Sequence, residues 1–258
     1  MRYLGGKSRI AASIAEVINA VHGRENPHSE AGSAASLPLF SGGGENCFIS
    51  LFCGSCAVES KVKGFSSITC NDRHPYLIAL LNAVKSGWQP PDTVSEDEYR
   101  FIRQNKDLHP ALTGFVGFGC SFGGKWFGGY ARDKYGRNYA AQASQSLLAD
   151  MVALMGATFI CSDYRSVKIP PGAVVYADPP YANTTGYSGE KFDSDEFWIC
   201  ARLIAETGHK IFVSEQQAPP GWVAVWEKPF TRTLDRNKSN QFQITEKLFT
   251  WSGTDEQT

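Results

Sequence analysis

Short apolar segments alternate with segments of helical periodicity along most of this chain, and that alternation limits the fold more than any other feature. The apolar segments, which predict strands, are residues 47–52, 67–70, 158–161, 173–177, 210–213, 222–226 and 247–251. Helical spacing predicts helices over residues 10–21, from residue 57, 75–87, 144–155 and 195–206, the last with Ser194 as its N-cap. Alternating strands and helices form a parallel sheet covered on both faces. The sequence therefore predicts an α/β protein with a Rossmann-like sheet.

Two stretches interrupt the alternation. Residues 22–46 are rich in Gly, Ser, Ala and Pro without any period, and they predict a long loop. Residues 88–139 combine glycines, aromatic residues and cations with only short periodic pieces. We interpret this second stretch as a small, mainly helical subdomain. The predicted organisation is a main domain of residues 1–87 and 140–258, interrupted by the insertion 88–139.

Composition is that of an ordinary globular protein. The 258 residues suffice for one α/β domain with a smaller insertion, and the formal net charge of −1 does not itself indicate a nucleic-acid partner. No apolar run approaches the roughly 18–20 residues that span a bilayer. The seven cysteines are an odd, scattered number, which is typical of reduced thiols in a cytoplasmic protein. The five histidines lack metal-ligand spacing, so we expect no metal.

Glycine and carboxylate residues follow four of the predicted strands. These residues are Gly54, Asp72, Asp163 and Asp178. Ligands of open parallel sheets bind beyond the carboxyl ends of the strands, so the arrangement predicts a ligand site at that edge. Gly54 opens a turn that lets the backbone approach a ligand, and Asp72 would accept hydrogen bonds from both hydroxyls of a ribose. The competing interpretation is a tight turn and a surface aspartate.

The turn that contains Gly54 also contains a Cys-x-x-Cys sequence, formed by Cys53 and Cys56. Such a pair between a strand and a helix is the layout of a thiol–disulfide oxidoreductase, and it could be half of a zinc site. Zinc would require a second pair of ligands, and the sequence has no second Cys-x-x-Cys. Buried, unreactive thiols are the preferred interpretation.

The most informative tetrapeptide is Asp178-Pro179-Pro180-Tyr181. Two prolines stiffen the turn, Asp178 and the carbonyl of Pro179 supply two acceptors, and Tyr181 supplies a flat aromatic face. Two acceptors on the hydrogens of a planar amine would draw its lone pair onto nitrogen and aim it at a methyl donor. The alternative is a rigid turn after a buried strand.

Three motifs, taken in order, resemble those of the Dam-type DNA adenine-N6 methyltransferases whose N-terminal motif precedes the cofactor loop. Residues 2–7, Arg-Tyr-Leu-Gly-Gly-Lys, resemble the aromatic-x-Gly-Gly-Lys motif of that family. Residues 52–57, Phe-Cys-Gly-Ser-Cys-Ala, resemble its Phe-x-Gly cofactor loop, and residues 178–181 match its catalytic motif letter for letter. Residues 162–164, Ser-Asp-Tyr, resemble a short segment that precedes the catalytic motif.

The resemblance implies a methyltransferase domain that uses S-adenosylmethionine, and it implies roles for individual residues. The implied cofactor-binding residues are Tyr3, Gly5, Gly6, Lys7, Phe52, Gly54, Asp72, Asp163 and Asp178. Among them, Asp72 would hold the ribose and Asp163 the adenine amine of the cofactor. The implied catalytic residues are Lys7, Asp178, Pro179 and Tyr181. The chain departs from the family at Ser50 and Leu51, where an acid is frequent, and at Cys56, where a second glycine is frequent.

The family places target recognition between its cofactor half and its catalytic half, so the resemblance implies that the insertion binds double-stranded DNA. Cations interleaved with aromatic residues suit phosphate contact and base stacking. The implied DNA-binding residues are Lys125, Trp126, Tyr130, Arg132, Lys134 and Arg137, together with Arg232, Arg236 and Lys238 near the C-terminus. Arg132 and Arg137 are candidates for guanine contacts. The alternative is a solvated loop whose aromatic residues fill a small core.

The expected function is site-specific methyl transfer from S-adenosylmethionine to N6 of an adenine flipped out of duplex DNA. One alternative is methylation of another planar amine, such as cytosine N4 or an RNA base. Another is a DNA-binding protein with lost or weak catalysis, which the departures at Ser50 and Cys56 suggest. The expected location is the cytoplasm of a bacterium, with a chromosomal or phage gene and with or without a cognate restriction nuclease.

Overall fold

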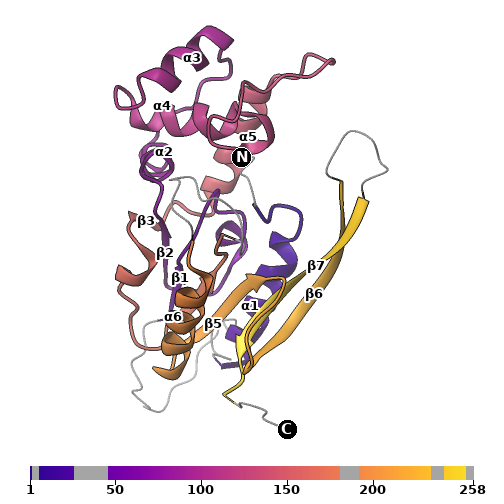
Figure 1. Ribbon diagram of the computed structural model, residues 1–258. Helices are drawn as coiled ribbons and strands as arrows, with labels where there is room; N and C mark the ends of the chain where they lie inside the picture. The colour runs from indigo at the N-terminus through magenta and orange to yellow at the C-terminus, as the bar shows by residue number, and fades with distance from the viewer. Residues whose placement is uncertain (2–5, 26–45, 181–191, 234–240, 254–258) are drawn as a thin grey trace, which may run out of the picture.

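The computed structural model describes residues 1, 6–25, 46–180, 192–233 and 241–253, and a seven-stranded sheet runs through the centre of this part of the chain (Figure 1). The strands are β1 Cys47–Ser50, β2 Ser67–Asp72, β3 Thr158–Cys161, β4 Val174–Ala177, β5 Lys210–Glu215, β6 Trp222–Thr233 and β7 Gln241–Trp251. Their order is β3-β2-β1-β4-β5-β7-β6. Neighbours from β3 to β5 pair in parallel, whereas β7 pairs antiparallel with β5 and β6. The predicted parallel sheet is confirmed over five strands.

Helices cover both faces of the sheet, as the alternation predicts. They are α1 Ala11–Glu25, α2 Pro75–Lys85, α3 Glu96–Gln104, α4 Pro110–Gly114, α5 Tyr139–Val152 and α6 Ser194–Glu206. Phe48 and Tyr176 share an apolar core with α1, whereas Ile49 and Val175 share one with α6. Successive side chains along a strand point to opposite faces, so β1 and β4 each contribute to both cores. This two-sided packing identifies the predicted Rossmann-like α/β fold.

Some predicted boundaries on the N-terminal side are wrong. Helix α1 continues to Glu25, so the predicted loop begins later, and residues 26–45 lie outside the described part. The helix expected from residue 57 is only the 3-10 turn Glu59–Lys61. Gly64, at φ 84°, takes the chain back toward β2 directly after that turn, which leaves no room for a longer helix.

The starts of two other helices differ from the prediction because N-cap residues, which apolar periodicity does not report, fix where each helix begins. Helix α6 begins at Ser194, and its N-cap is Asp193, whose carboxylate accepts from the Glu196 amide; Ser194 is not the cap. Helix α5 begins at Tyr139 with Asn138 as its N-cap, five residues before the predicted start. The predicted domain boundary after residue 139 therefore falls inside α5. In the part of the chain described here, no helix is both long and apolar enough to cross a bilayer.

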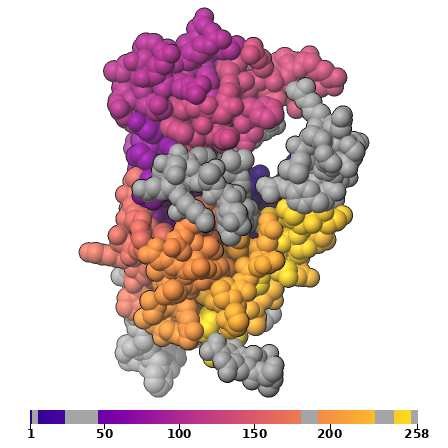
Figure 2. Space-filling model, in the orientation of Figure 1, coloured from indigo at the N-terminus to yellow at the C-terminus, as the bar shows by residue number. Residues whose placement is uncertain are grey.

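The segment 88–139 consists of short helices joined by irregular stretches. It contains α3, α4, a π-helical turn at Phe115–Gly119 and a 3-10 turn at Phe122–Gly124. Gly117 permits the close packing of this segment, because a Cβ atom there would lie 2.2 Å from the Trp126 ring. Figure 2 shows the magenta and pink surface of this segment gathered at one end of the molecule, away from the orange and yellow surface of α6, β6 and β7.

Candidate active site

The carboxyl ends of β2, β1 and β4 lie side by side, and they bring the predicted site residues together. The Leu51 amide donates to the Tyr176 carbonyl at 2.9 Å, which ties the end of β1 to β4. The Cys53 amide donates to the Asn71 carbonyl at 2.7 Å, which ties the following turn to β2. The turn after β1 therefore lies between Asp72 at the end of β2 and Asp178 directly after β4.

Asn71 holds this edge of the sheet in place. Its side-chain amide donates to the Leu51 carbonyl at 2.9 Å and to the Ser162 carbonyl at 3.1 Å. One buried side chain thus joins the ends of three neighbouring strands. These hydrogen bonds hold the ends of the three strands together at this edge of the sheet.

Asp72 accepts hydrogen bonds from the backbone and faces the glycine turn. The Gly54 amide donates to Oδ2 at 3.0 Å, and the His74 amide donates to Oδ1 at 2.9 Å. Burial raises the pKa of Asp72, and the backbone hydrogen bonds from His74, Gly54 and Arg73 offset part of that rise. A carboxylate offers about four acceptor sites, so lone pairs remain for the two hydroxyls of a ribose. Gly54, at φ 49°, has the conformation expected of the predicted turn.

Lys7 lies between two carboxylates. Its Nζ atom is 2.9 Å from Oδ1 of Asp178 and 3.5 Å from Oε2 of Glu246 on β7. Lys7 is buried, with 6% of its surface exposed, and Asp178 is half-buried. The ion pair brings together Lys7 and the first residue of the Asp178–Tyr181 tetrapeptide, which are 171 positions apart in the sequence.

More carboxylates than cations face this ion pair. Glu215, at the end of β5, is 8% exposed, and its Oε2 atom has no hydrogen-bond partner in the described part of the chain. Burial raises the pKa of Glu215 to about 7, the Lys7 ammonium opposes that rise, and Asp178 adds to it. Burial likewise raises the pKa of Asp178, against the opposing effect of Lys7. An edge with this excess of buried carboxyls favours a cationic ligand.

An aromatic cluster borders the turn at Phe52. The Phe52 ring lies 5.2 Å from Tyr164, 5.9 Å from Phe192 and 5.8 Å from Phe197, measured between ring centroids. Such contacts fix the Phe52 ring, which the resemblance assigns to the cofactor pocket. The structure supports a rigid wall at this position.

Asp163 is bound by a neighbouring arginine. Arg165 donates to its two oxygens at 2.7 Å and 2.8 Å and also bonds Glu196 at 2.8 Å. The Arg165 guanidinium lowers the pKa of Asp163 to about 2. Asp163 therefore stays ionised at neutral pH, and only its remaining lone pairs are open to an adenine amine.

The Cys-x-x-Cys pair has the surroundings of structural thiols. Cys53, Cys56 and Cys70 are buried and carry free thiols. The pKa of each is raised: burial is the main cause for Cys53, whereas hydrogen bonds between the thiols lead for Cys56 and Cys70. A reactive cysteine needs a lowered pKa, so these positions favour unreactive thiols over a redox pair. Among the described residues, no cluster of His, Cys, Asp and Glu could hold a metal.

Cys56 has a left-handed backbone, with φ 58°, at the position where the resembled family often has glycine. A side chain in that conformation costs about 1–2 kcal/mol, and alanine keeps the cost while losing the buried thiol. We expect Cys56→Gly to be more stable than Cys56→Ala by about 1 kcal/mol, the reverse of the usual order. Urea unfolding of both variants measures this difference. A more stable alanine variant would show that the backbone is unstrained.

The predicted DNA-binding residues of residues 88–139 fall into two groups. Trp126 and Tyr130 are half-buried: the Trp126 ring stacks on Tyr76 at 5.5 Å, and the Tyr130 hydroxyl donates to the Val94 carbonyl at 2.7 Å. Both rings hold the segment together. The cations that are exposed at the surface are Lys125, Arg132, Lys134 and Arg137.

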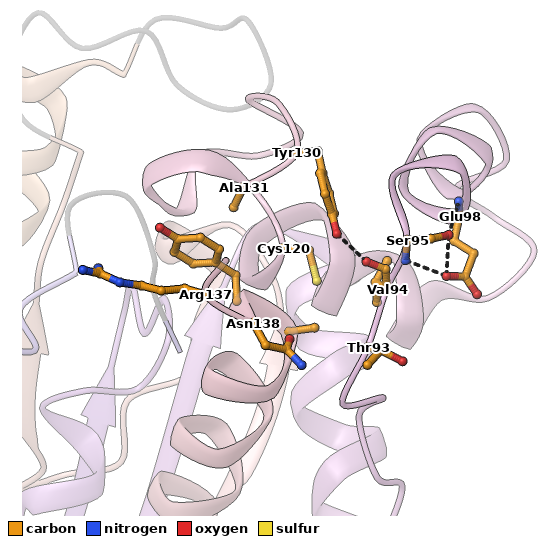
Figure 3. Close-up of a pocket in the computed structure, with 11 residues that line it drawn as sticks. Thr93, Val94, Ser95, Glu98, Cys120, Tyr130, Ala131, Arg137 and Asn138 are labelled. Carbon is orange, nitrogen blue, oxygen red and sulfur yellow. Dashed lines mark hydrogen bonds between the residues drawn. The ribbon is translucent and has the colours of Figure 1, made fainter. Parts of the chain in front are cut away.

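A pocket of about 330 Å³ lies inside the helical segment, apart from the strand ends (Figure 3). Several of its polar groups are bonded within the segment. Ser95 and Glu98 form a reciprocal cap at the start of α3, and the Tyr130 hydroxyl is bonded to Val94. Arg137 points away from the other labelled side chains in Figure 3. We regard this pocket as a packing feature rather than the site.

Several predicted site residues lie outside the described part of the chain. They are Tyr3, Gly5, Tyr181, Arg236 and Lys238, and the side chain of Arg232 is not described either. Gly6 is described and exposed, next to the buried Lys7. Pro179 is buried beside Asp178.

Three buried or half-buried glutamates of the site were not singled out from the sequence. Glu215 is the last residue of β5 and lies two positions after the predicted apolar segment 210–213, so the strand-end rule that selected Asp178 could have selected it. Glu246 lies within β7 and Glu59 within a short turn, where periodicity carries no signal for a site.

Comparison with known proteins gives one match that spans most of the chain. The family described as D12 class N6 adenine-specific DNA methyltransferase matches residues 3–108 and 124–244. No curated protein sequence shows significant similarity.

Solved structures resemble the chain only distantly. An rRNA methyltransferase from Streptomyces viridochromogenes is 14% identical over 88% of this chain and 93% of its own, with a TM-score of 0.34. A candidate RNA methyltransferase from Pyrococcus horikoshii is 10% identical over 81% of this chain and 75% of its own, with a TM-score of 0.36. At these values the two structures carry no argument about substrate.

Proposed function

Because the chain belongs to the D12 class of N6 adenine-specific DNA methyltransferases, we propose that it methylates N6 of an adenine flipped out of double-stranded DNA at a specific sequence. S-adenosylmethionine is the methyl donor of this enzyme family. The observation that carries the proposal is the junction of strand ends, where the Gly54 turn lies between Asp72 and the Lys7–Asp178 pair.

The residues at the junction fit the cofactor. Asp72 suits a ribose, Phe52 is held in an aromatic wall, and the excess of buried carboxyls suits a molecule with a positive sulfur. When bound, the cofactor supplies an electrophilic methyl group on that sulfur. The same residues would hold it against the turn after β1.

The chain's own contribution is to orient and activate the amine. Asp178 and the carbonyl of Pro179 would accept the two hydrogens of the exocyclic amine, which localises the nitrogen lone pair. Lys7 lowers the pKa of Asp178 and so favours its ionised form, against the opposing effect of burial. As the nitrogen–carbon bond forms and the carbon–sulfur bond breaks, the amine gives up one proton, and Asp178 is the adjacent acceptor.

The exposed cations Lys125, Arg132, Lys134 and Arg137 support a role of the helical segment in binding the phosphate backbone. Two of them are engaged in the free protein: Arg132 pairs with Glu96 at 3.0 Å, and Arg137 with Asp133 at 3.1 Å. Exposed pairs of this kind are worth about 0–1 kcal/mol, so DNA phosphates can displace them at little cost.

The function is tested with labelled S-adenosylmethionine and duplex DNA that contains all four bases. Digestion of the product to nucleosides should give labelled N6-methyladenine. Label on cytosine N4, or label only with RNA, would indicate the alternative substrates. Cofactor binding without any transfer to nucleic acid would favour a DNA-binding protein with lost catalysis.

Asp72→Ala is expected to weaken cofactor affinity about 10- to 100-fold, because hydrogen bonds to a charged acceptor contribute about 1.5–3 kcal/mol. Calorimetry with the cofactor and with an analogue that lacks the ribose hydroxyls measures the effect. The analogue should bind weakly to the wild-type protein and equally weakly to Asp72→Ala, since the interacting pair is absent in both. Asp97→Ala, at an exposed position of α3, is the matched control. If wild type and Asp72→Ala lose affinity by the same factor when the cofactor is replaced by the analogue, Asp72 does not bind the ribose hydroxyls.

A further inference from the structure

A carboxylate that the mechanism leaves unused is buried behind the end of β1. Glu59 is 2% exposed, and Ser50, the last residue of β1, is 0% exposed. The Ser50 hydroxyl donates to Oε1 of Glu59 at 2.6 Å. Burying a carboxyl without a hydrogen-bond partner is costly, so the Ser50 hydroxyl offsets part of the cost of burying Glu59.

Ser50 is also the position at which this chain lacks the acid that the resembled family often has. The structure places a carboxyl against that same position, from nine residues further along the chain. The Asp178 carboxylate contributes to raising the pKa of Glu59, and Glu59 in turn contributes to raising the pKa of the buried thiols of Cys53, Cys56 and Cys70. Glu59 therefore places a carboxyl beside position 50.

We propose that Glu59, acting through Ser50, supplies the negative charge that selects the cationic methyl donor over its neutral product. The inference rests on the proposed function, because it assumes that the cofactor lies at the turn after β1. S-adenosylmethionine carries a positive sulfur, whereas S-adenosylhomocysteine has an uncharged thioether. An ionised Glu59 therefore attracts the donor and leaves the product free to depart.

Electrostatics of the surroundings support this role. Burial raises the pKa of Glu59 to about 7, while the Ser50 hydroxyl and the backbone amides of Glu59 and Val58 lower it. In the free protein at neutral pH the group is near half ionisation. A cation bound nearby favours the charged form, so binding of the donor releases a proton from Glu59.

Donor affinity should rise by up to about tenfold as pH increases from 6 to 8, because the proton no longer has to be removed on binding. Product affinity should change much less. Glu215 titrates in the same range and Asp178 and Asp72 also have raised pKa values, so only the difference between wild type and a Glu59 variant isolates Glu59.

The test is calorimetry of donor and product binding to the whole protein at pH 6, 7 and 8. Glu59→Gln keeps the shape and removes the charge. At pH 8 we expect it to weaken donor binding about tenfold and product binding by no more than about twofold. The rise of donor affinity with pH should shrink by the same factor. Glu16→Gln, at an exposed position of α1, is the control with an identical change of charge.

Exchanging the two residues provides the second arm. Ser50→Glu/Glu59→Ser conserves the total side-chain volume and returns the carboxyl to position 50. We expect this double variant to recover most of the donor preference that Glu59→Gln loses, with an unfolding temperature that shows it is folded.

The outcomes separate this inference from the proposed function. Equal weakening of donor and product by Glu59→Gln, or no weakening, overturns the role of Glu59 and leaves the proposed function standing. A wild-type protein that binds neither molecule overturns both. A folded exchange variant without donor preference also counts against the inference.

Discussion

Asp178→Ala is expected to reduce kcat/KM for methyl transfer by at least about 10³-fold, while the cofactor still binds. The reason is that Asp178 is the hydrogen-bond acceptor at the strand end. Preorganised acceptors commonly contribute about 10²–10³ in rate, and the variant loses the proton acceptor in addition. Transfer of label to DNA, measured beside cofactor calorimetry, separates the two effects. Asp195→Ala, at an exposed position of α6, is the control.

The same variant is expected to remain folded. Burial raises the pKa of Asp178 in the folded protein. The fold therefore becomes less stable as pH rises through that pKa, because the buried carboxyl must ionise. An alanine at position 178 has no carboxyl to ionise and does not carry this cost. Lys7 keeps Glu246 as a partner at 3.5 Å. The unfolding temperature of Asp178→Ala at pH 8 should therefore equal or exceed that of the wild type. Transfer within tenfold of wild type would show that another group activates the amine.

Much of the fold could be predicted because it depends on local pattern. The strand Thr158–Cys161 was predicted to the residue, and the strand before Asp178 begins only one residue later than predicted, at Val174. The hairpin of β6 and β7 could not be predicted at its length of 12 and 11 residues. The two strands extend beyond the apolar segments 222–226 and 247–251 into more polar sequence. Pairing between strands that are distant in sequence determines their length, and local pattern does not report it.

The site was predictable only where a residue follows a strand. Asp72 and Asp178 follow that rule, and the structure places them on either side of the Gly54 turn. Glu246 lies in the interior of β7, and Glu59 lies in a 3-10 turn where the sequence predicted a helix. The order of the strands and the direction of each side chain determine whether these glutamates lie near Lys7 and Asp178. Local periodicity predicts neither.

Lys7→Met is expected to lower kcat/KM about 10²- to 10³-fold at pH 7 and to move the acidic limb of the pH–rate profile upward by at least about one unit. Lys7 is the ammonium that opposes the raised pKa of both Asp178 and Glu215. Without it, Asp178 ionises only at higher pH, so activity should recover partly as pH increases. Rates measured from pH 6 to 9 with saturating cofactor test this shift.

The stability of Lys7→Met should depend on pH in the opposite direction from its activity. Removing one partner of a buried ion pair costs about 3–5 kcal/mol, because the remaining carboxylates are left uncompensated. Carboxyls with raised folded pKa values bind protons that the unfolded chain releases, so the loss is largest at pH 8 and shrinks toward pH 6. Urea unfolding at both values measures it, with the exposed Lys63→Met as control. An equal loss at both values would mean that Lys7 acts by packing alone and that the carboxyls around it are not electrostatically coupled to it.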